Sequence, residues 1–150
     1  MAQHTQAFNE ALRRALKELA KGDRFAAEIR EVLERKGYAA DVANEVLEHL
    51  NRKGLLSDQR AAESVLRRLS GKRAAGPAKI KQLLTQRGAS AETVEAILSG
   101  KEGAQVVEIV DLLRAKFPSG ATREGAGRFL YGRGFSEDAI ESALEQWVAR

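Results

Sequence analysis

One short phrase returns three times along this chain and constrains its fold more than any other feature. In each copy a leucine is followed within four residues by a basic residue and a glycine, at 33–37, 84–88 and 130–134. The glycines lie 51 and then 46 residues apart, and apolar residues follow each one at offsets of six, nine and ten positions. A period of this size is typical of repeat proteins, whose units bury their apolar faces together. We therefore predict a stack of three related units that offers an extended surface rather than a pocket.

Nearly every segment has the spacing of an amphipathic helix, and no segment alternates as a strand would. Near the N-terminus, apolar residues three or four positions apart share one helical face: Phe8, Leu12, Leu16 and Leu19. The predicted fold is all-α, with nine helices as three tandem three-helix repeats in an elongated, curved stack. We expect the repeats to span residues 1–56, 57–100 and 101–150.

Local signals place the ends of several helices. A glycine such as Gly37, Gly88 or Gly134 can adopt the left-handed conformation that ends a helix, so each of these three is predicted to close the second helix of its unit. Ser57 or Asp58, then Ser90 and Thr122, can accept hydrogen bonds from the free amides of a first turn. Residues 71–76 contain two glycines and are predicted to interrupt the helical pattern before Pro77.

Composition argues against several classes of site. The chain has no cysteine, which removes disulfides and thiolate chemistry and fits a cytoplasmic protein. Charged residues interrupt the N-terminal segment where a signal peptide needs an apolar core, and no apolar run approaches the length of a membrane span. His4 and His49 are the only side chains that ordinarily titrate near neutrality, and no nucleophile pattern accompanies them. We expect no catalytic residue, no cofactor and no metal site.

The most informative chemical feature is a basic block in the middle of the chain. Between residues 64 and 91 there are seven basic residues and no acidic one, whereas the rest of the chain has 18 basic and 21 acidic residues. The seven are Arg67, Arg68, Lys72, Arg73, Lys79, Lys81 and Arg87. If two helices fold back on each other here, these cations could offset the charge of a polyanion or dock on an acidic protein surface. The alternative is a solvated pair of helices without a partner.

Aromatic residues are absent from the basic block, so base stacking is unsupported there. Four aromatic residues gather in the last unit, and we expect them to belong to its core: Phe129, Tyr131, Phe135 and Trp147. Exposure of Tyr131 or Trp147 would instead indicate a contact residue, because aromatics are enriched among interface anchors.

Three pieces of the chain form a pattern through their order and spacing. The first runs from Ala27-Glu28-Ile29 to Lys36-Gly37-Tyr38, and the second from Leu50 through Leu55-Leu56-Ser57-Asp58 to Arg87-Gly88. The third is Lys116-Phe117, then Arg128-Phe129-Leu130-Tyr131-Gly132-Arg133-Gly134-Phe135-Ser136. Together they resemble the RecX family of regulatory proteins, which modulate the RecA recombinase, and the third piece is the closest match. The resemblance implies a non-enzymatic protein that lies in the groove of the RecA–DNA filament. There it would limit filament growth, ATP hydrolysis and strand exchange in recombination, DNA repair and the SOS response.

We accordingly expect a monomer that binds the RecA filament, with weak electrostatic contacts to single- or double-stranded DNA and none to a membrane. The basic block would supply the charge-complementary contact, and Arg128 and Arg133 of the third unit would form a second patch. Two other hypotheses stay open at this point. A general DNA-binding helical module would use the same cations without RecA, and a scaffold would bind neither.

Overall fold

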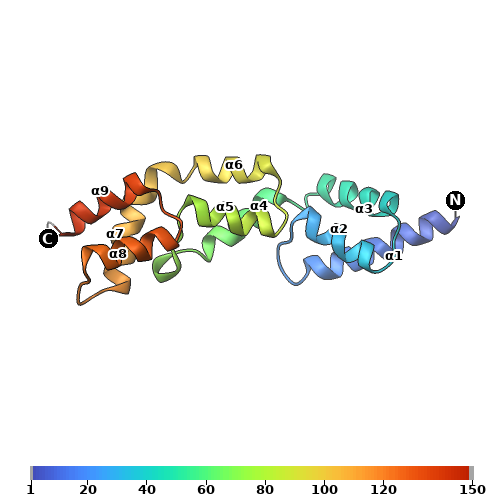
Figure 1. The fold of residues 1–150 in the computed structure, drawn as a ribbon. Coiled ribbons are helices and arrows are strands. Elements are labelled where there is room, and N and C mark those ends of the chain that lie inside the picture. Colours follow the sequence, from blue (N-terminus) through green and yellow to red (C-terminus); the bar gives the residue numbers. More distant parts are fainter. Residues whose placement is uncertain (1, 149–150) are drawn as a thin grey trace.

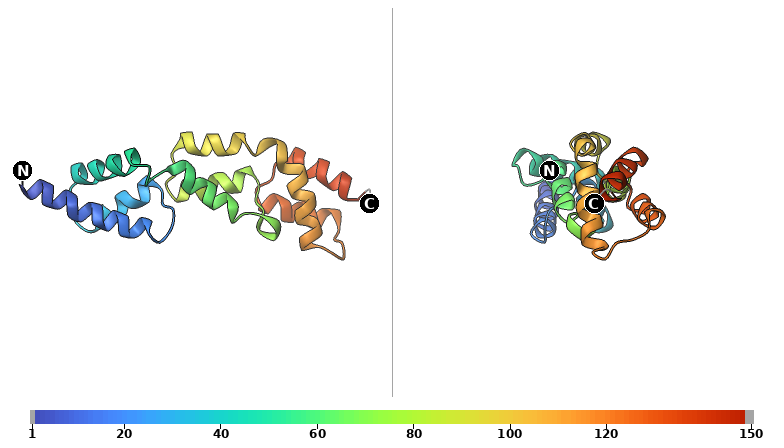
Figure 2. Two further views of the ribbon diagram at one scale, coloured as in Figure 1. Left: turned by 180° about the vertical axis from the view of Figure 1, so that it is seen from behind. Right: turned by 90° about the vertical axis from the view of Figure 1, so that its left-hand side faces the viewer.

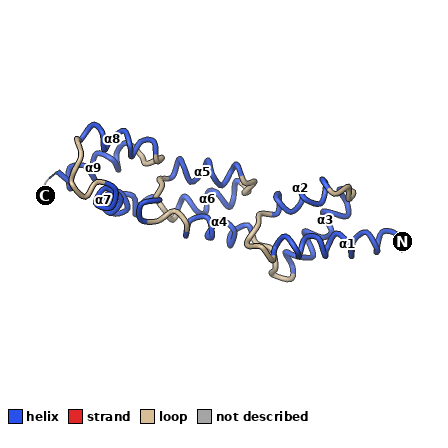
Figure 3. Tube along the Cα trace, turned by 90° about the horizontal axis from the view of Figure 1, so that it is seen from below, coloured by secondary structure: helices blue, strands red, loops and turns tan. Residues whose placement is uncertain are grey.

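The computed structural model describes residues 2–148, and within them the chain consists of helices and loops only (Figure 3). The first unit contains α1 (Ala2–Leu19), α2 (Ala26–Arg35) and α3 (Ala40–Arg52). The second contains α4 (Asp58–Arg67), the short 3₁₀ helix η1 (Gly71–Arg73), α5 (Pro77–Gln86) and α6 (Ala91–Ser99). The third contains the 3₁₀ helix η2 (Glu102–Ala104), α7 (Gln105–Lys116), α8 (Arg123–Gly132) and α9 (Glu137–Val148).

The three units follow one another in an elongated stack, with the two ends of the chain at opposite ends of the molecule (Figure 1). Viewed along the stack, the third helices α3, α6 and α9 lie at successive positions around its axis, so the stack twists (Figure 2). The predicted all-α stack of three three-helix units is confirmed for the part of the chain that the structure describes. The unit boundaries at 56/57 and 100/101 stay a prediction.

Each unit has its own apolar core, and one residue crosses into the next core at each junction. The first cluster is built from α1, α2 and α3, the second mainly from α4, α5 and α6, and the third mainly from α7, α8 and α9. Phe25, which precedes α2, is fully buried in the second cluster, and Ala74, from the segment after η1, belongs to the third. The units are therefore joined by shared core residues as well as by the chain.

The predicted helix starts are confirmed where a side-chain cap was expected. Ser57 Oγ accepts a hydrogen bond from the Arg60 amide at 3.2 Å, Ser90 Oγ from Thr93 at 3.1 Å, and Thr122 Oγ1 from Gly125 at 3.0 Å. Asp58, the alternative to Ser57, has a different role. Its carboxylate accepts a hydrogen bond from the Ala26 amide at 2.9 Å, so the first residue of α4 caps α2 of the preceding unit.

The glycines of the repeated phrase close the second helix of each unit, as predicted. Gly37, Gly88 and Gly134 have φ values of 92°, 93° and 86°, in the left-handed region that favours glycine. The predicted interruption at 71–76 is also confirmed: it contains η1, and Pro77 is the first residue of α5. After this interruption α5 runs back along α4, which gives the antiparallel pair that the basic block requires (Figure 1).

Candidate interaction surface

The cations of the basic block are divided between the two ends of the second unit. Arg67 and Arg68 lie at the end of α4, and Lys79 and Lys81 in the first turns of α5, on the side that meets the third unit. Lys72 and Arg73, in η1, connect these two groups. Arg87 follows the last residue of α5 and lies at the opposite end, beside the first unit. The fold thus gathers six of the seven cations toward the third unit and separates Arg87 from them.

Most of these six side chains are accessible. Arg67, Arg68, Lys72, Arg73 and Lys81 are exposed, and Lys79 is half-buried. Arg67 makes one local contact, in which its guanidinium donates to Ser64 Oγ at 2.8 Å. Exposed cations with no carboxylate between residues 64 and 91 can approach a polyanion without first breaking strong ion pairs.

Arg87 is held within the chain, at the junction of the first and second units, which we call the first joint. Its guanidinium donates to the two carboxylate oxygens of Glu28 at 3.0 and 3.2 Å and lies 5.1 Å from the centroid of the Phe25 ring. Glu28 also accepts a hydrogen bond from the Phe25 amide at 2.9 Å. A half-buried, bidentate arginine of this kind fixes the orientation of two units.

Arg133 has the equivalent place at the junction of the second and third units, which we call the second joint. Its guanidinium donates to the carbonyl oxygens of Lys72 at 3.0 Å and Ala74 at 2.6 Å. Its own carbonyl accepts from the Gly76 amide at 2.8 Å, and the Gly134 carbonyl accepts from Ala78 at 3.1 Å. Arg133 therefore ties η1, with its two exposed cations, to the third unit.

Arg128, the other member of the expected second patch, is exposed on α8. Arg133 lies instead in the second joint, with its guanidinium 5.5 Å from the centroid of the Phe129 ring. The structure consequently leaves Arg128 accessible on the outer face of the third unit and keeps Arg133 half-buried.

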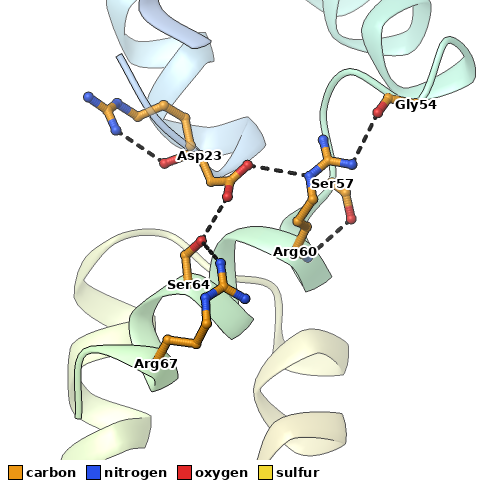
Figure 4. Close-up of polar contacts among 7 residues, drawn as sticks. Asp23, Gly54, Ser57, Arg60, Ser64 and Arg67 are labelled. Atoms are coloured by element: carbon orange, nitrogen blue, oxygen red, sulfur yellow. Dashed lines mark hydrogen bonds and ion pairs between the residues drawn. The ribbon is translucent and has the colours of Figure 1, made fainter. Parts of the chain in front are cut away.

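Figure 4 shows a second polar network at the first joint, centred on Asp23. The Asp23 carboxylate accepts hydrogen bonds from Ser64 Oγ at 2.7 Å and from Arg60 Nε at 3.3 Å. The hydrogen bond from Ser64 and, after it, the bond and charge of Arg60 lower the pKa of Asp23, against an opposing contribution from burial. Arg60 also donates to the Gly54 carbonyl at 3.2 Å, so this network links the α1–α2 turn, the α3–α4 turn and α4.

Sequence reasoning missed Asp23, Glu28 and Asp58 as residues that join the units. Glu28 and Asp58 each stand in the first turn of a helix, where a carboxylate is favoured by that helix alone. Their contacts with Arg87 and Ala26 span 59 and 32 residues of sequence. No short-range pattern signals such partners.

The third helix of every unit is poor in basic residues and has a net negative charge. Arg52 is the only lysine or arginine within the bounds of α3, α6 and α9. The acidic residues on these helices are exposed: Asp41, Glu45, Glu48, Glu92, Glu95, Glu137, Asp138, Glu141 and Glu145. The third helices are therefore net acidic, whereas the densest group of cations lies on the α4–η1–α5 segment.

The aromatic residues of the last unit have different environments. Phe135 is buried in the third core, Phe129 packs edge-to-face on Phe117 with ring centroids 5.4 Å apart, and Trp147 is partly buried. Tyr131 is 69% exposed, so the expectation that it belongs to the core is wrong. It directly follows the buried Leu130, and the next residue of a helix points about 100° away from the core direction.

The two histidines lie in separate surroundings. His4 Nε2 lies 3.0 Å from the Glu45 carboxylate at the surface, and the His49 ring packs edge-to-face on Phe8. Across residues 2–148, no group of three or more His, Cys, Asp or Glu side chains is placed to hold a metal ion. None of the helices described is both long and apolar enough to cross a membrane.

Comparison with known proteins places these features in a family. The family model for the first three-helix domain of RecX matches residues 11–50. The regulatory protein RecX of Halorhodospira halophila is 34% identical over 143 residues, which cover 91% of this chain and 88% of that protein. The regulatory protein RecX of Leptothrix cholodnii is 33% identical over 136 residues, which cover 87% and 85%.

The crystal structure of RecX from Lactobacillus salivarius has the same fold. It superposes with a TM-score of 0.84 at 22% identity and covers 97% of this chain and 99% of that one. The similarity extends over all three units, so the arrangement of the whole stack is shared and not only that of its first unit.

Proposed function

We propose, because this chain belongs to the RecX family of regulatory proteins, that it binds the RecA–DNA filament and inhibits filament growth, ATP hydrolysis and strand exchange. It would act through contacts alone, as a monomer and without an enzymatic step. The observation that carries the proposal is the exposed basic segment α4–η1–α5 at the middle of an elongated stack. A long, narrow molecule with central cations suits a groove lined by protein and DNA phosphates.

The residues proposed for the contact fall into two groups. The exposed cations would meet the filament directly: Arg67, Arg68, Lys72, Arg73, Lys81 and Arg128, with the half-buried Lys79 beside them. Arg87 and Arg133 donate to groups of the chain itself. We propose that these two act by holding the three units in the orientation that fits the groove.

The proposal is tested by following ATP hydrolysis by RecA on single-stranded DNA with time, in the presence of the protein. We expect inhibition by the wild-type protein and its loss in a triple variant, Arg68→Glu, Arg73→Glu and Lys81→Glu, because each change reverses an exposed charge. The control variant carries Arg13→Glu, Lys17→Glu and Lys53→Glu, which make the same change in net charge at exposed positions of the first unit and the turn that follows it. Unchanged inhibition by the triple variant, folded by circular dichroism, would rule out these cations as the contact.

The second candidate function, a general DNA-binding module, is supported by the same lack of carboxylates between residues 64 and 91. Its affinity for naked DNA should fall steeply with salt, by roughly 10³-fold or more between 50 and 200 mM if six phosphates are contacted. Salt-sensitive DNA binding without any effect on RecA would favour this function over the first.

A further inference from the structure

The residue that follows the repeated glycine differs in the second unit. It is Tyr38 in the first unit and Phe135 in the third, but Ala89 in the second. Phe135 is 3% exposed and belongs to the third core, and Tyr38 packs against the first core. Two of the three units therefore place an aromatic ring at this position, and the middle unit lacks one.

An open groove lies at this position in the second unit. It has a volume of about 530 Å³ and runs between α5 and α6. Its apolar lining includes Ala89, Val94 and Leu98, and its polar lining includes Lys81, Thr85 and Glu95. This volume is within the range of about 300–1,000 Å³ that is usual for binding sites.

The repeat shows what kind of group fits this groove. Val94 and Leu98 stand six and ten residues after Gly88, as Ile140 and Leu144 stand after Gly134. In the third unit these two residues belong to the same buried cluster as Phe135. The corresponding residues of the first unit, Ala43 and Leu47, belong to the cluster on which Tyr38 packs. The same backbone framework thus packs an aromatic ring in both sister units.

The rim of the groove carries one charge of each sign. Lys81, from α5, is exposed and belongs both to the groove and to the proposed contact surface. Glu95, from α6, is exposed on the opposite wall. A partner segment whose polar groups pair with Lys81 and Glu95 would therefore hold an incoming aromatic side chain in register.

We propose that the groove between α5 and α6 receives an aromatic side chain from a partner protein, on a segment that pairs with Lys81 and Glu95 at the rim. The ring would lie over Val94 and Leu98, where the sister units have Phe135 and Tyr38. The inference rests on the proposed function in taking that partner to be the protein component of the filament. It adds an apolar anchor to a surface that otherwise recognises charge, and buried aromatic anchors dominate the affinity of many interfaces.

The first test fills the groove with the ring of the sister units, by Ala89→Phe. We expect the variant to fold and to need a roughly 30-fold higher concentration for half-maximal inhibition of ATP hydrolysis by RecA on single-stranded DNA, the loss expected for one interface anchor. The matched control, Ala96→Phe, adds the same ring at an exposed position of α6 outside the groove and should inhibit like the wild type. Wild-type inhibition by folded Ala89→Phe would overturn the proposal and leave the proposed function intact.

A second test does not need RecA. N-acetyl-phenylalanine amide is titrated into the ¹⁵N-labelled protein, and amide chemical shifts are followed. We expect saturable shifts centred on Thr85, Ala89, Val94 and Leu98, and their loss in Ala89→Phe. Absence of shifts at these amides up to the solubility limit of the probe, or shifts that persist in Ala89→Phe, would overturn the proposal.

The two tests separate the failure of this inference from that of the proposed function. If the wild-type protein does not inhibit RecA, the proposed function fails, and the titration alone decides whether the groove binds an aromatic ring. A second copy of the chain could also supply the ring through its exposed Tyr131. Concentration-dependent dimers in sedimentation, abolished both by Ala89→Phe and by Tyr131→Ala, would overturn the proposal in favour of self-association.

Discussion

The three glycines of the repeated phrase have nearly the same backbone conformation but different surroundings. A Cβ built on Gly37 would meet nothing within 4 Å. A Cβ on Gly88 would lie 2.7 Å from the Cβ of Ala27, and one on Gly134 would overlap the backbone of Lys79. All three glycines therefore end a helix. Gly88 and Gly134 also permit close contact with the preceding unit.

This difference predicts unequal costs for the same substitution at two positions. Gly37→Ala should lower the free energy of unfolding by about 1 kcal/mol, from the strain of a left-handed alanine. Gly134→Ala carries the same strain, and its methyl group must also displace the Lys79 backbone, which should add roughly 1–3 kcal/mol. Urea unfolding at neutral pH measures both values. Equal losses at the two positions would contradict the view that Gly134 is required by the second joint.

The features that were predicted correctly from the sequence are those that depend on local chemistry. The caps at Ser57, Ser90 and Thr122, and Pro77 at the start of α5, depend on hydrogen bonds or backbone angles within a few residues. Such features can be predicted from a local pattern. The exposure of Tyr131 was mispredicted because its aromatic character was weighed above its place in the helix, directly after the buried Leu130.

Between elements, the two joints use related positions and different chemistry. The first joint relies on side-chain contacts of carboxylates, those of Asp23, Glu28 and Asp58. The second relies on backbone hydrogen bonds between 76–78 and 133–134 and on Arg133, which donates to two carbonyl groups. The pKa of Asp23, in the first joint, is lowered by its contacts with Ser64 and Arg60 of the second unit, so loss of its charge in acid should make a difference to the stability of that joint.

Asp23 allows this difference to be measured. Because contacts with Ser64 and Arg60 lower the pKa of folded Asp23 below its reference value of 3.8, they stabilise the fold fully at pH values well above 3.8. That stabilisation is lost as the pH falls below 3.8 through the lowered folded pKa. Asp23→Asn should therefore be less stable than the wild type at pH 7, by up to about 1 kcal/mol for such a partly exposed pair, and the difference should shrink toward pH 3.

Urea midpoints of the two proteins at pH 7, 5, 4 and 3 test this expectation. The control is Glu141→Gln, which removes an exposed carboxylate on α9, far from the first joint. If the difference in urea midpoint between the wild type and Asp23→Asn stays constant from pH 7 to pH 3, the charge of Asp23 does not stabilise the joint.

The joints are also the part of the candidate surface that could not be predicted from the sequence. Arg87 and Arg133 were expected to face a partner because they are basic and lie near other basic residues. Their acceptors, Glu28 and the Ala74 carbonyl, are each 59 residues away in sequence. The helical period predicts which side of one helix is buried, but it does not predict how a following unit docks. The group of cations on α4, η1 and α5 could be predicted because it follows from local composition alone. Most of these side chains are exposed.

At the scale of the whole molecule, stability depends on the coupling of three small cores. In repeat proteins each unit contributes its own stability together with the contact energy of its neighbours. No unit here has more than three α-helices, and each junction shares a core residue between units. Phe25 is the largest such residue: it immediately precedes α2 of the first unit and is fully buried among Ala61, Ile80 and Leu84 of the second.

Phe25→Ala therefore tests whether the second unit depends on a core residue that the first unit supplies. Removing a buried phenylalanine should lower the free energy of unfolding by about 3–5 kcal/mol. Here the second unit should be destabilised, although Phe25 immediately precedes α2 of the first unit. Native-state hydrogen exchange should show faster exchange at amides of α5 and α6, such as Leu84 and Ile97. Ile29→Ala, one turn later in the first core, should act mainly on α1–α3. Wild-type protection of α5 and α6 in Phe25→Ala would mean that the units are stable separately, so that a filament groove could bend the stack at the first joint without unfolding it.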